Sequence, residues 1–327
     1  MRNINYIHHA LLTGIAAGVL AGAAYAQSYP AKPVRVIDAY PPGGGTDIVA
    51  RAISPRFQES LGQPWIIDSR AGAGGIIGAE IASKAAPDGY TLLMFTTNFT
   101  IHPSIYKNLP FDLMKAFTPV TQTSSLATAM IVHPSVPANT VNDLIALARA
   151  KPGRLNYSSS GFGGIIHMAG ELFDTMARVK MAHIPYKGGA PAMLAVLGGE
   201  VDLTFVAIPV AAPHIRSGKV RAIAVSTLKR SSVLPQVPTI AEAGLPGYEV
   251  VNAYGVLAPA GTPREIVVKL QQEIARVLNL PDVRERLMAV GAEPVASTPE
   301  QFGSFLRSEI TKWAGVVKAT GIELQPW

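Results

Sequence analysis

Short apolar runs, each followed by a glycine-rich turn and then by apolar residues at helical spacing, recur along the chain. The first run covers residues 34–37. Two prolines and three glycines follow at 41–45, and residues 48–53 resume at helical spacing. This order predicts a strand, a glycine loop and a helix. We expect Thr46 to be the N-cap of that helix and Pro55 to kink or shorten it.

The same order of strand, glycine loop and helix returns further along the chain. Strands are predicted at 64–67, 155–160 and 181–184, each before a glycine loop, and helices are predicted from 76, at 165–176 and at 192–197. Such alternation is typical of an α/β fold, in which ligands lie beyond the carboxyl ends of strands. A strand at 90–95 brings Thr97 and Asn98 to that edge, where they either contact a ligand or only cap the loop.

The last third of the chain predicts two strands and three helices. The strands cover 220–225 and 247–257, and the second returns the chain to the first domain. A short helix is expected at 234–244. Thr262 and Thr298 each begin a threonine-proline capping box before a long helix whose apolar stripe belongs to the core.

Residues 1–26 have the features of a cleavable signal peptide. Arg2 precedes an apolar stretch at 10–22, and residues 24–26 have the small-x-small form of a signal peptidase site. We therefore expect an exported soluble protein, located in a bacterial periplasm. A domain boundary near residue 128 divides the mature chain into lobe 1, residues 27–128 and 250–327, and lobe 2, residues 129–249.

Composition narrows the class of partner. With 48% hydrophobic and 15% charged residues, the chain can bury a large core and is long enough for two domains. Its formal net charge of +6 is scattered along the sequence, which suits small anions and provides no basic stripe for nucleic acid. The absence of cysteine agrees with an oxidising compartment.

The glycine loops at 40–47 and 158–164 are the candidate anion sites. Each ends at a helix start, where free backbone N–H groups and the helix dipole favour negative charge. The alternative is a tight turn that binds nothing. The candidate contacts are Tyr40, Gly43, Gly44, Thr46 and Asp47 in the first loop and Ser158, Ser160, Gly161, Phe162, Gly163 and Gly164 in the second. Asp202, at the entrance of a predicted strand, either bridges loops across the site or faces water.

Several motifs that would indicate other chemistry are incomplete. A dinucleotide fingerprint needs a glycine at position 48 or 77, and isoleucine occupies both. A hydrolase elbow needs glycines on both sides of Ser160, where Ser158 and Phe162 stand. His167 is expected as a buried helix-face residue, with a catalytic base as the alternative. No histidines have the spacing of a metal site. We therefore expect neither a cofactor nor a metal.

Seven motifs, in order, resemble those of the tripartite tricarboxylate transporter solute receptors, also called the Bug family. They are YPPGGGTDIVAR, AGAGGIIGAE, AAPDGYTLL, LNYSSSGFGG, PYKGGAPAMLAVLGGEVDL, LPQVPTIAEAGLPGYEV and LAPAGTP. The resemblance implies a type II periplasmic binding protein fold, with two α/β lobes around a central ligand cleft, joined by two crossing strands. It also implies that loops 42–47 and 158–164 hold a carboxylate through backbone N–H groups, small hydroxyls and water. Membrane permease subunits would be the partners of a monomeric receptor.

Three positions depart from the family pattern: Pro55, Phe162 and Ala253, which stands where a bulky aromatic usually precedes Tyr254. We expect Ala253 to enlarge the pocket and the ligand to be an aromatic or long-chain dicarboxylate. The alternative is that the nearby aromatics are ordinary core packing. The aromatics expected to line the pocket are Tyr40, Phe99, Phe162 and Tyr254.

Three functional hypotheses follow. The first is a receptor that captures an organic carboxylate and presents it to a permease. The second is a sensory partner that binds the same ligand and signals. The third is an exported hydrolase or lyase that uses Ser160 and His167.

Overall fold

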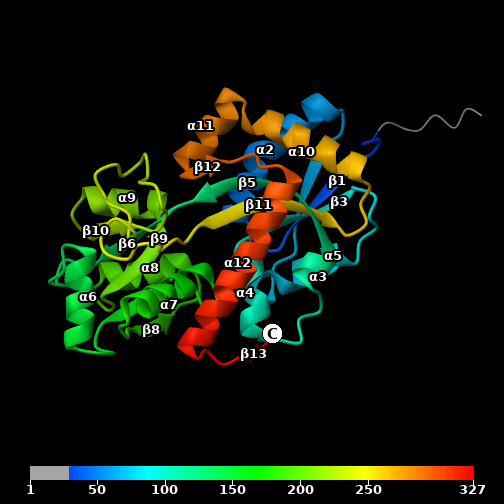
Figure 1. Cartoon of the computed structure of the whole chain (residues 1–327). Helices are drawn as coiled ribbons and strands as arrows, with labels where there is room; N and C mark the ends of the chain where they lie inside the picture. The colour runs from blue at the N-terminus through cyan, green and yellow to red at the C-terminus, as the bar shows by residue number, and fades with distance from the viewer. Residues whose placement is uncertain (1–28) are drawn as a thin grey trace, which may run out of the picture.

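The computed structural model describes residues 29–327, which form two α/β lobes (Figure 1). Each lobe is built on one sheet with helices packed on it. The two-lobed α/β fold predicted from the sequence is therefore confirmed. The predicted signal peptide, residues 1–26, lies outside the described residues. Between residues 29 and 327 no helix has both the length and the apolar composition needed to cross a membrane.

The first lobe has a six-stranded sheet in the order β12-β5-β11-β3-β1-β2. The strands are β1 (Val34–Asp38), β2 (Trp65–Ser69), β3 (Thr91–Thr96), β5 (Phe117–Leu126), β11 (Asn252–Pro259) and β12 (Ala292–Pro294). β1, β2 and β3 are parallel, whereas β11 is antiparallel to β3 and β5. Its helices are α2 (Gly45–Leu61), η1 (Ala73–Gly75), α3 (Ile76–Ser83), α4 (Asn98–Ile105), α5 (Leu113–Ala116), α10 (Arg264–Leu278), α11 (Pro281–Ala289) and α12 (Pro299–Thr320). The short strands β4 (Tyr106–Lys107) and β13 (Gln325–Pro326) pair with each other.

The second lobe has a five-stranded sheet in the order β10-β6-β9-β7-β8. The strands are β6 (Thr128–Val132), β7 (Asn156–Ser159), β8 (Ala182–Pro185), β9 (Leu203–Ala207) and β10 (Arg221–Val225), and the helices are α6 (Val141–Ala150), α7 (Ile165–Ala177), α8 (Gly189–Leu197) and α9 (Ile208–Arg216). β7 is parallel to β8 and β9, so the carboxyl ends of these strands meet at one edge.

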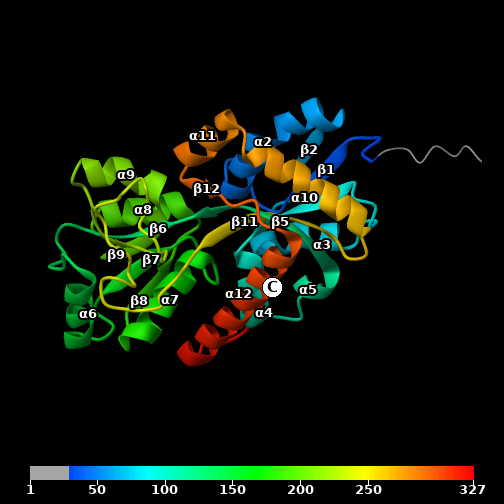
Figure 2. The ribbon, with the colours of Figure 1, turned by 45° about the horizontal axis from the view of Figure 1, so that its top comes forward.

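Two chain connections cross between the lobes (Figure 2). β5 ends at Leu126 and β6 begins at Thr128, so an almost continuous strand passes from the first sheet to the second. The chain returns through residues 226–251, where the carbonyl of Ser226 accepts the N–H of Val250 at 2.8 Å, and re-enters the first sheet as β11. The lobe limits at residues 128 and 250 remain predictions, and both fall at these connections.

Helix α12 packs against both lobes, along their junction in Figure 1. Phe302 and Leu306, in its first half, belong to an apolar core of the first lobe. Trp313 and Val316, in its second half, are buried in the core of the second lobe. The two lobes are thus joined by helix packing as well as by the two connections.

The first helix differs from its prediction at two positions. α2 begins at Gly45 with Gly44 as N-cap, and no side chain caps it. The hydroxyl of Thr46 instead donates to Asp38 Oδ1 at 2.7 Å, because a buried carboxylate needs donors. Pro55 neither ends nor shortens the helix, which runs for 17 residues through it. Buried Ile53 and Phe57 hold the turns on either side against the core.

Three predictions near the C-terminus are corrected. Residues 234–244 form turns and no helix, since prolines at 235 and 238 remove two backbone donors. The return strand begins at Asn252, later than expected. Thr262 caps nothing, because its hydroxyl donates to the Pro259 carbonyl at 2.7 Å and α10 begins after Pro263. The capping box at Thr298 is confirmed.

Candidate functional site

A cavity of about 560 Å³ lies between the lobes. Strands β1, β3, β7 and β9 reach it with their carboxyl ends, which is where open α/β sheets place ligands. We call it the cleft cavity. Of the site residues predicted from the sequence, it brings together Tyr40, Gly43, Gly44, Thr46, Asn98, Ser160, Gly161, Phe162, Gly163, Gly164 and Tyr254. Ligand contact by each of them stays a prediction.

Asp202 and Asp47 do not line the cleft cavity. Asp202 precedes β9 and therefore lies at the amino edge of the sheet, where its carboxylate accepts the N–H of Asn156 at 2.8 Å. Asp47 is buried in the first turn of α2, and its Oδ2 accepts the N–H of Gly43 at 2.9 Å. Asp202 thus joins two strands of the second lobe, and Asp47 fixes the first glycine loop from its buried side.

Thr97 and Ser158 are likewise buried behind the cavity wall. Thr97 Oγ1 accepts the N–H of Ala253 at 2.8 Å, which ties the end of β3 to β11. Ser158 Oγ donates to the carbonyl of Ala192 at 2.9 Å, which ties β7 to α8. Both hydroxyls satisfy buried backbone groups that have lost water.

The structure corrects the expectation that Ala253 enlarges the pocket. Neighbouring residues of a strand face opposite sides of its sheet. Tyr254 faces the cleft cavity, whereas Ala253 is fully buried in the apolar core that contains Phe99. Phe99 is also absent from the cavity wall. Among the described residues, the tyrosine and phenylalanine rings that line the cavity are those of Tyr40, Tyr106, Phe162 and Tyr254.

The first glycine loop presents the start of α2 to the cavity. Gly44 is the N-cap, so the N–H groups of the first helical residues have no intrahelical acceptor. Gly45 has no room for a side chain, since a Cβ there would lie 2.0 Å from the hydroxyl oxygen of Tyr254. That hydroxyl accepts from Asn252 Nδ2 at 3.0 Å, and its own proton has no acceptor among residues 29–327. The free N–H groups at the start of α2 and the hydroxyl proton of Tyr254 therefore lie close together at the cavity.

Asp38 lies directly behind this loop and is fully buried. Its Oδ1 accepts the Thr46 hydroxyl at 2.7 Å and the Tyr40 N–H at 3.1 Å, whereas its Oδ2 has no partner among the described residues. Burial raises the pKa of this carboxyl, and the bonds from Thr46 and Tyr40 oppose that rise. Asp38 was not among the site residues predicted from the sequence, although its position at the end of β1, just before the loop, could have indicated that it supports the loop.

The second glycine loop presents the start of α7, but not all of its donors are free. The N–H of Gly163 is bound by His167 Nδ1 at 3.1 Å, and the N–H of Ile165 by Asn98 Oδ1 at 3.1 Å. The N–H groups of Gly164 and Ile166 have no acceptor among the described residues. Fewer backbone N–H groups of this loop are therefore available to a ligand than its sequence suggests.

A chain of hydrogen bonds crosses the cavity wall from one lobe to the other. Tyr40 donates its hydroxyl proton to the Gly74 carbonyl at 2.7 Å and accepts from Asn98 Nδ2 at 3.1 Å. Asn98 in turn accepts the N–H of Ile165, at the start of the second-lobe helix α7. Asn98 thus connects the two lobes directly.

His102 is a cavity residue that the sequence analysis missed. It lies on α4, one turn after Asn98, and is 4% exposed. Its Nδ1 has no partner among the described residues, and burial lowers its pKa to about 4, so the ring is neutral at neutral pH. Its Nε2 and the Tyr106 hydroxyl both lie 3.8 Å from where a Cβ on Gly74 would be. Gly74 thus leaves this polar corner accessible to a small group.

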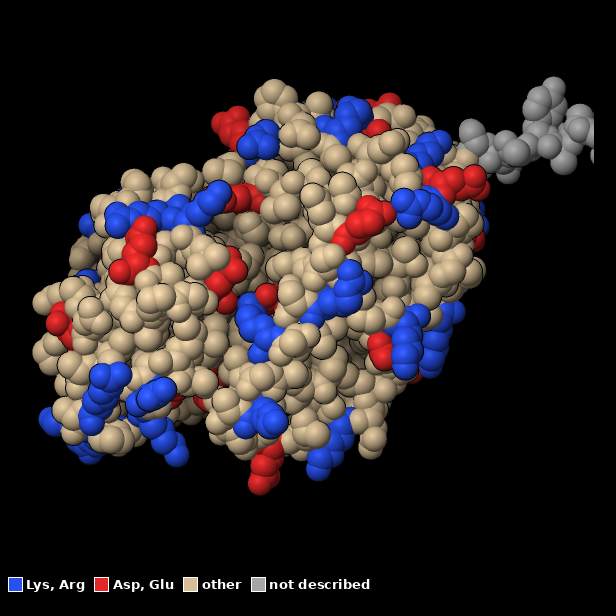
Figure 3. All heavy atoms as spheres, in the orientation of Figure 1, with Lys and Arg blue, Asp and Glu red and all other residues tan. Residues whose placement is uncertain are grey.

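No Lys, Arg, Asp or Glu lines the cleft cavity within the described part of the chain. On the face shown in Figure 3, basic and acidic side chains are interspersed over both lobes and form no continuous stripe. An anion in the cavity would therefore meet hydrogen-bond donors and helix ends in place of a cation. Residues 29–327 also contain no group of three or more potential metal ligands.

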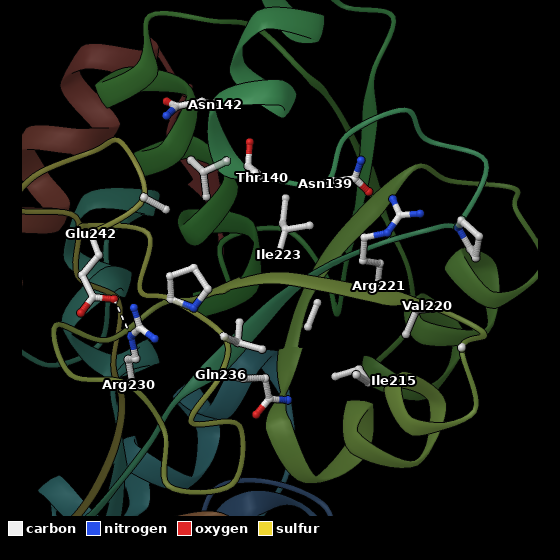
Figure 4. Close-up of a pocket in the computed structure, with 17 residues that line it drawn as sticks. Asn139, Thr140, Asn142, Ile215, Val220, Arg221, Ile223, Arg230, Gln236 and Glu242 are labelled. Carbon is white, nitrogen blue, oxygen red and sulfur yellow. Dashed lines mark hydrogen bonds and ion pairs between the residues drawn. The ribbon is translucent and has the colours of Figure 1, made fainter.

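A larger cavity of about 810 Å³ lies on the second lobe, beside β10 and the start of α6 (Figure 4). Its two arginines already have acceptors: Arg230 pairs with Glu242 at 2.8 Å, and Arg221 donates to the Ala138 carbonyl at 2.9 Å. None of the glycine loops reaches it. We therefore take the cleft cavity, where donors converge without acceptors, as the candidate site.

Comparisons with known proteins place this geometry in one family. Residues 49–322 match the model of the tripartite tricarboxylate transporter family receptor. The chain is 37% identical to Protein BugT of Bordetella pertussis over 313 residues, which are 95% of this chain and 96% of that protein.

Two solved structures of carboxylate-bound proteins are also similar to this chain. The R. palustris protein Rpa4515 with adipate is 36% identical, with a TM-score of 0.80, over 91% of this chain and 100% of that one. MatC from Rhodopseudomonas palustris with bound malate is 33% identical, with a TM-score of 0.76, over 88% of this chain and 100% of that one. The chain therefore belongs to the Bug family of tripartite tricarboxylate transporter receptors, which are periplasmic solute-binding proteins.

Proposed function

We propose that this receptor captures an organic carboxylate in the cleft cavity and delivers it to a tripartite tricarboxylate-type permease from the periplasm. The observation that carries the proposal is the convergence of two helix starts, one from each lobe, on a cavity that no charged side chain of residues 29–327 lines. Backbone N–H groups at helix starts favour carboxylates. Adipate and malate in two solved relatives support the same ligand class.

Both lobes are required for useful affinity. A micromolar receptor needs about −8 kcal/mol, whereas charge at one partly buried helix end contributes at most about 2 kcal/mol. Closing the lobes around the ligand joins the donors of both glycine loops and removes water from the cleft. The hydrogen bond between Asn98 and Ile165 is already a contact of such a closed arrangement.

The proposed ligand is a dicarboxylate longer than four carbons, aliphatic or aromatic. A volume of about 560 Å³ is within the range of small-molecule sites and exceeds what a C4 acid fills. The rings of Tyr40, Phe162 and Tyr254 offer apolar surface to the part of the ligand between its two carboxylates. The cavity volume and these rings, in place of the predicted effect of Ala253, support a ligand of this size.

The hydrolase hypothesis lacks its geometry. A base for Ser160 needs a free ring nitrogen, but His167 uses Nδ1 to accept the N–H of Gly163, and its Nε2 lies 3.4 Å from Glu171 Oε1. Both nitrogens are turned to other partners, so the observations favour binding over turnover.

The test is a thermal-shift panel of malate, succinate, citrate, adipate and terephthalate on the mature chain, followed by calorimetry. Tight binding of adipate or terephthalate with release of intact ligand supports the proposal. Absence of binding to every carboxylate in the panel would refute it, and tight binding of malate or succinate alone would refute the size assignment.

A further inference from the structure

The rings of Tyr157, His183 and His167 stack beneath the second glycine loop, and carboxylate capture as proposed makes no use of them. His167 on α7 is 2% exposed, and His183 on β8 stacks on it with ring centroids 3.9 Å apart. Tyr157 on β7 stacks on His183 at 5.0 Å, and Phe162 of the loop tilts against His167 at 5.0 Å. The loop therefore rests on polarisable, titratable groups.

His167 is bound on both sides of its ring. Nδ1 accepts the N–H of Gly163 at 3.1 Å, so in the neutral ring the proton is on Nε2. Nε2 faces Glu171 Oε1 at 3.4 Å, and the Tyr157 hydroxyl donates to the same oxygen at 2.7 Å. Burial works to raise the pKa of Glu171, but the bonds from His167 and Tyr157 outweigh it and lower that pKa. The carboxylate thus keeps the Nε2 proton in place.

A parallel contact holds the other end of the loop. His183 Nε2 lies 2.6 Å from Ser159 Oγ, and that oxygen accepts the N–H of Gly161 at 3.2 Å. Gly161 and Gly163 have φ of +137° and +72°, a region that glycine enters at little cost and also leaves easily. Each of these two glycines has its N–H bound from beneath, which fixes an otherwise flexible segment.

We propose that His167 is a positioning residue for ligand capture: by accepting the Gly163 N–H, it fixes the second glycine loop so that Gly164 and Ile166 keep their N–H groups available to the cleft. This inference rests on the proposed function, since it concerns how the carboxylate is held.

Two other titratable groups in this part of the second lobe have shifted pKa values. Burial, helped by the nearby His167, lowers the pKa of His183 to about 4, so the second ring of the stack stays neutral as the pH falls. Burial and the neighbouring Glu171 raise the pKa of Asp174 to about 7, against the bond from Met181. Glu171 is the charged group that faces the His167 ring directly.

Two substitutions separate positioning from packing. His167→Phe keeps a ring in the stack but removes the acceptor, whereas His167→Asn places an amide oxygen near the position of Nδ1. With adipate at pH 7.5, we expect His167→Phe to weaken binding about five- to tenfold, as for loss of one hydrogen bond, and His167→Asn to stay within about twofold. Equal affinity of His167→Phe and wild type would overturn the proposal.

Nitrogen-15 NMR on the unliganded wild type tests positioning without a ligand or a variant. We expect His167 as the Nε2–H tautomer and the Gly163 amide protected from hydrogen exchange. An Nδ1–H tautomer would overturn the inference even if adipate binds. The expected tautomer together with no carboxylate binding would refute the proposed function and leave the loop support in place.

Discussion

Asn98 Oδ1 accepts the backbone N–H of Ile165 at 3.1 Å, so a side chain of the first lobe caps a helix of the second. The capped group belongs to the same helix start that is proposed to hold a carboxylate. Lobe contact and ligand capture therefore depend on neighbouring N–H groups. Their coupling can be tested by removing the amide.

Asn98→Ala should open the unliganded protein. One hydrogen bond contributes about 1 kcal/mol, which changes a two-state equilibrium about fivefold. We expect a larger radius of gyration without ligand by small-angle scattering, and compaction when adipate is saturating. Asn139→Ala, in the larger cavity on the second lobe, is the matched control. An unchanged radius in Asn98→Ala would show that this contact does not hold the lobes together.

Gly45→Ala should weaken ligand binding by tenfold or more. The new Cβ would lie 2.0 Å from the Tyr254 hydroxyl oxygen and so displace that ring or the start of α2. Gly189→Ala is the control, because Gly189 also lines the cavity but a Cβ there meets nothing within 4 Å. Calorimetry with adipate measures both. Similar losses in the two variants would argue against a specific role of the first glycine loop.

Removal of single cations should have little effect on affinity. Neither Arg70 nor Lys187 lines the cleft cavity, and the proposed donors are backbone N–H groups. We expect Arg70→Ala and Lys187→Ala to bind adipate within about twofold of wild type, with a weak dependence on salt. A folded alanine variant that no longer binds would show that a cation is part of the site.

His102 should make stability depend on pH. Its pKa is lowered by burial from about 6.5 in the unfolded chain to about 4 in the folded one. The unfolded state therefore binds a proton first, and the stability contributed by the neutral ring is present above about pH 6.5 and is lost as the pH falls towards 4. Urea unfolding of wild type and His102→Phe should converge or cross over this range. Parallel pH profiles would contradict the assignment.

Asp202→Asn should affect stability and leave binding unchanged. The carboxylate accepts the N–H of Asn156 at the edge of the sheet away from the cleft. Replacing a charged acceptor by an amide should cost about 1 kcal/mol in unfolding free energy. Adipate affinity, measured on the same preparation, should match wild type. A loss of affinity without a loss of stability would return Asp202 to the site.

The glycine loops were predictable because their chemistry is local. Prolines stop a strand, glycines permit positive φ, and a helix start follows within a few residues, so sequence order alone placed Gly44 and Gly163 at the cleft. The place of Asp202 was predictable as well, since a residue that precedes a parallel strand lies at the edge opposite to the ligand site. The positions of the glycine loops and of Asp202 both follow from the direction in which the chain runs through its strands.

Long-range partners could not be predicted in this way. Asn98 reaches Ile165 across 67 positions, and His102 enters the cavity because of how α4 packs between the lobes. Thr46 had the sequence of an N-cap, but the helix begins one residue before it and its hydroxyl donates to Asp38. Local sequence shows which hydrogen-bond donors are available, and tertiary packing determines which acceptor each donor binds.

Helix α12 determines how the molecule can be divided. Trp313, Val316 and Val317 come from the last third of the helix, yet they complete the core formed by residues of 129–249. That segment expressed alone would leave an apolar groove open to water and should be prone to aggregate. A peptide of residues 299–322 supplied in trans should rescue its solubility, so the boundary drawn by the strands is not the boundary of an independently folding fragment.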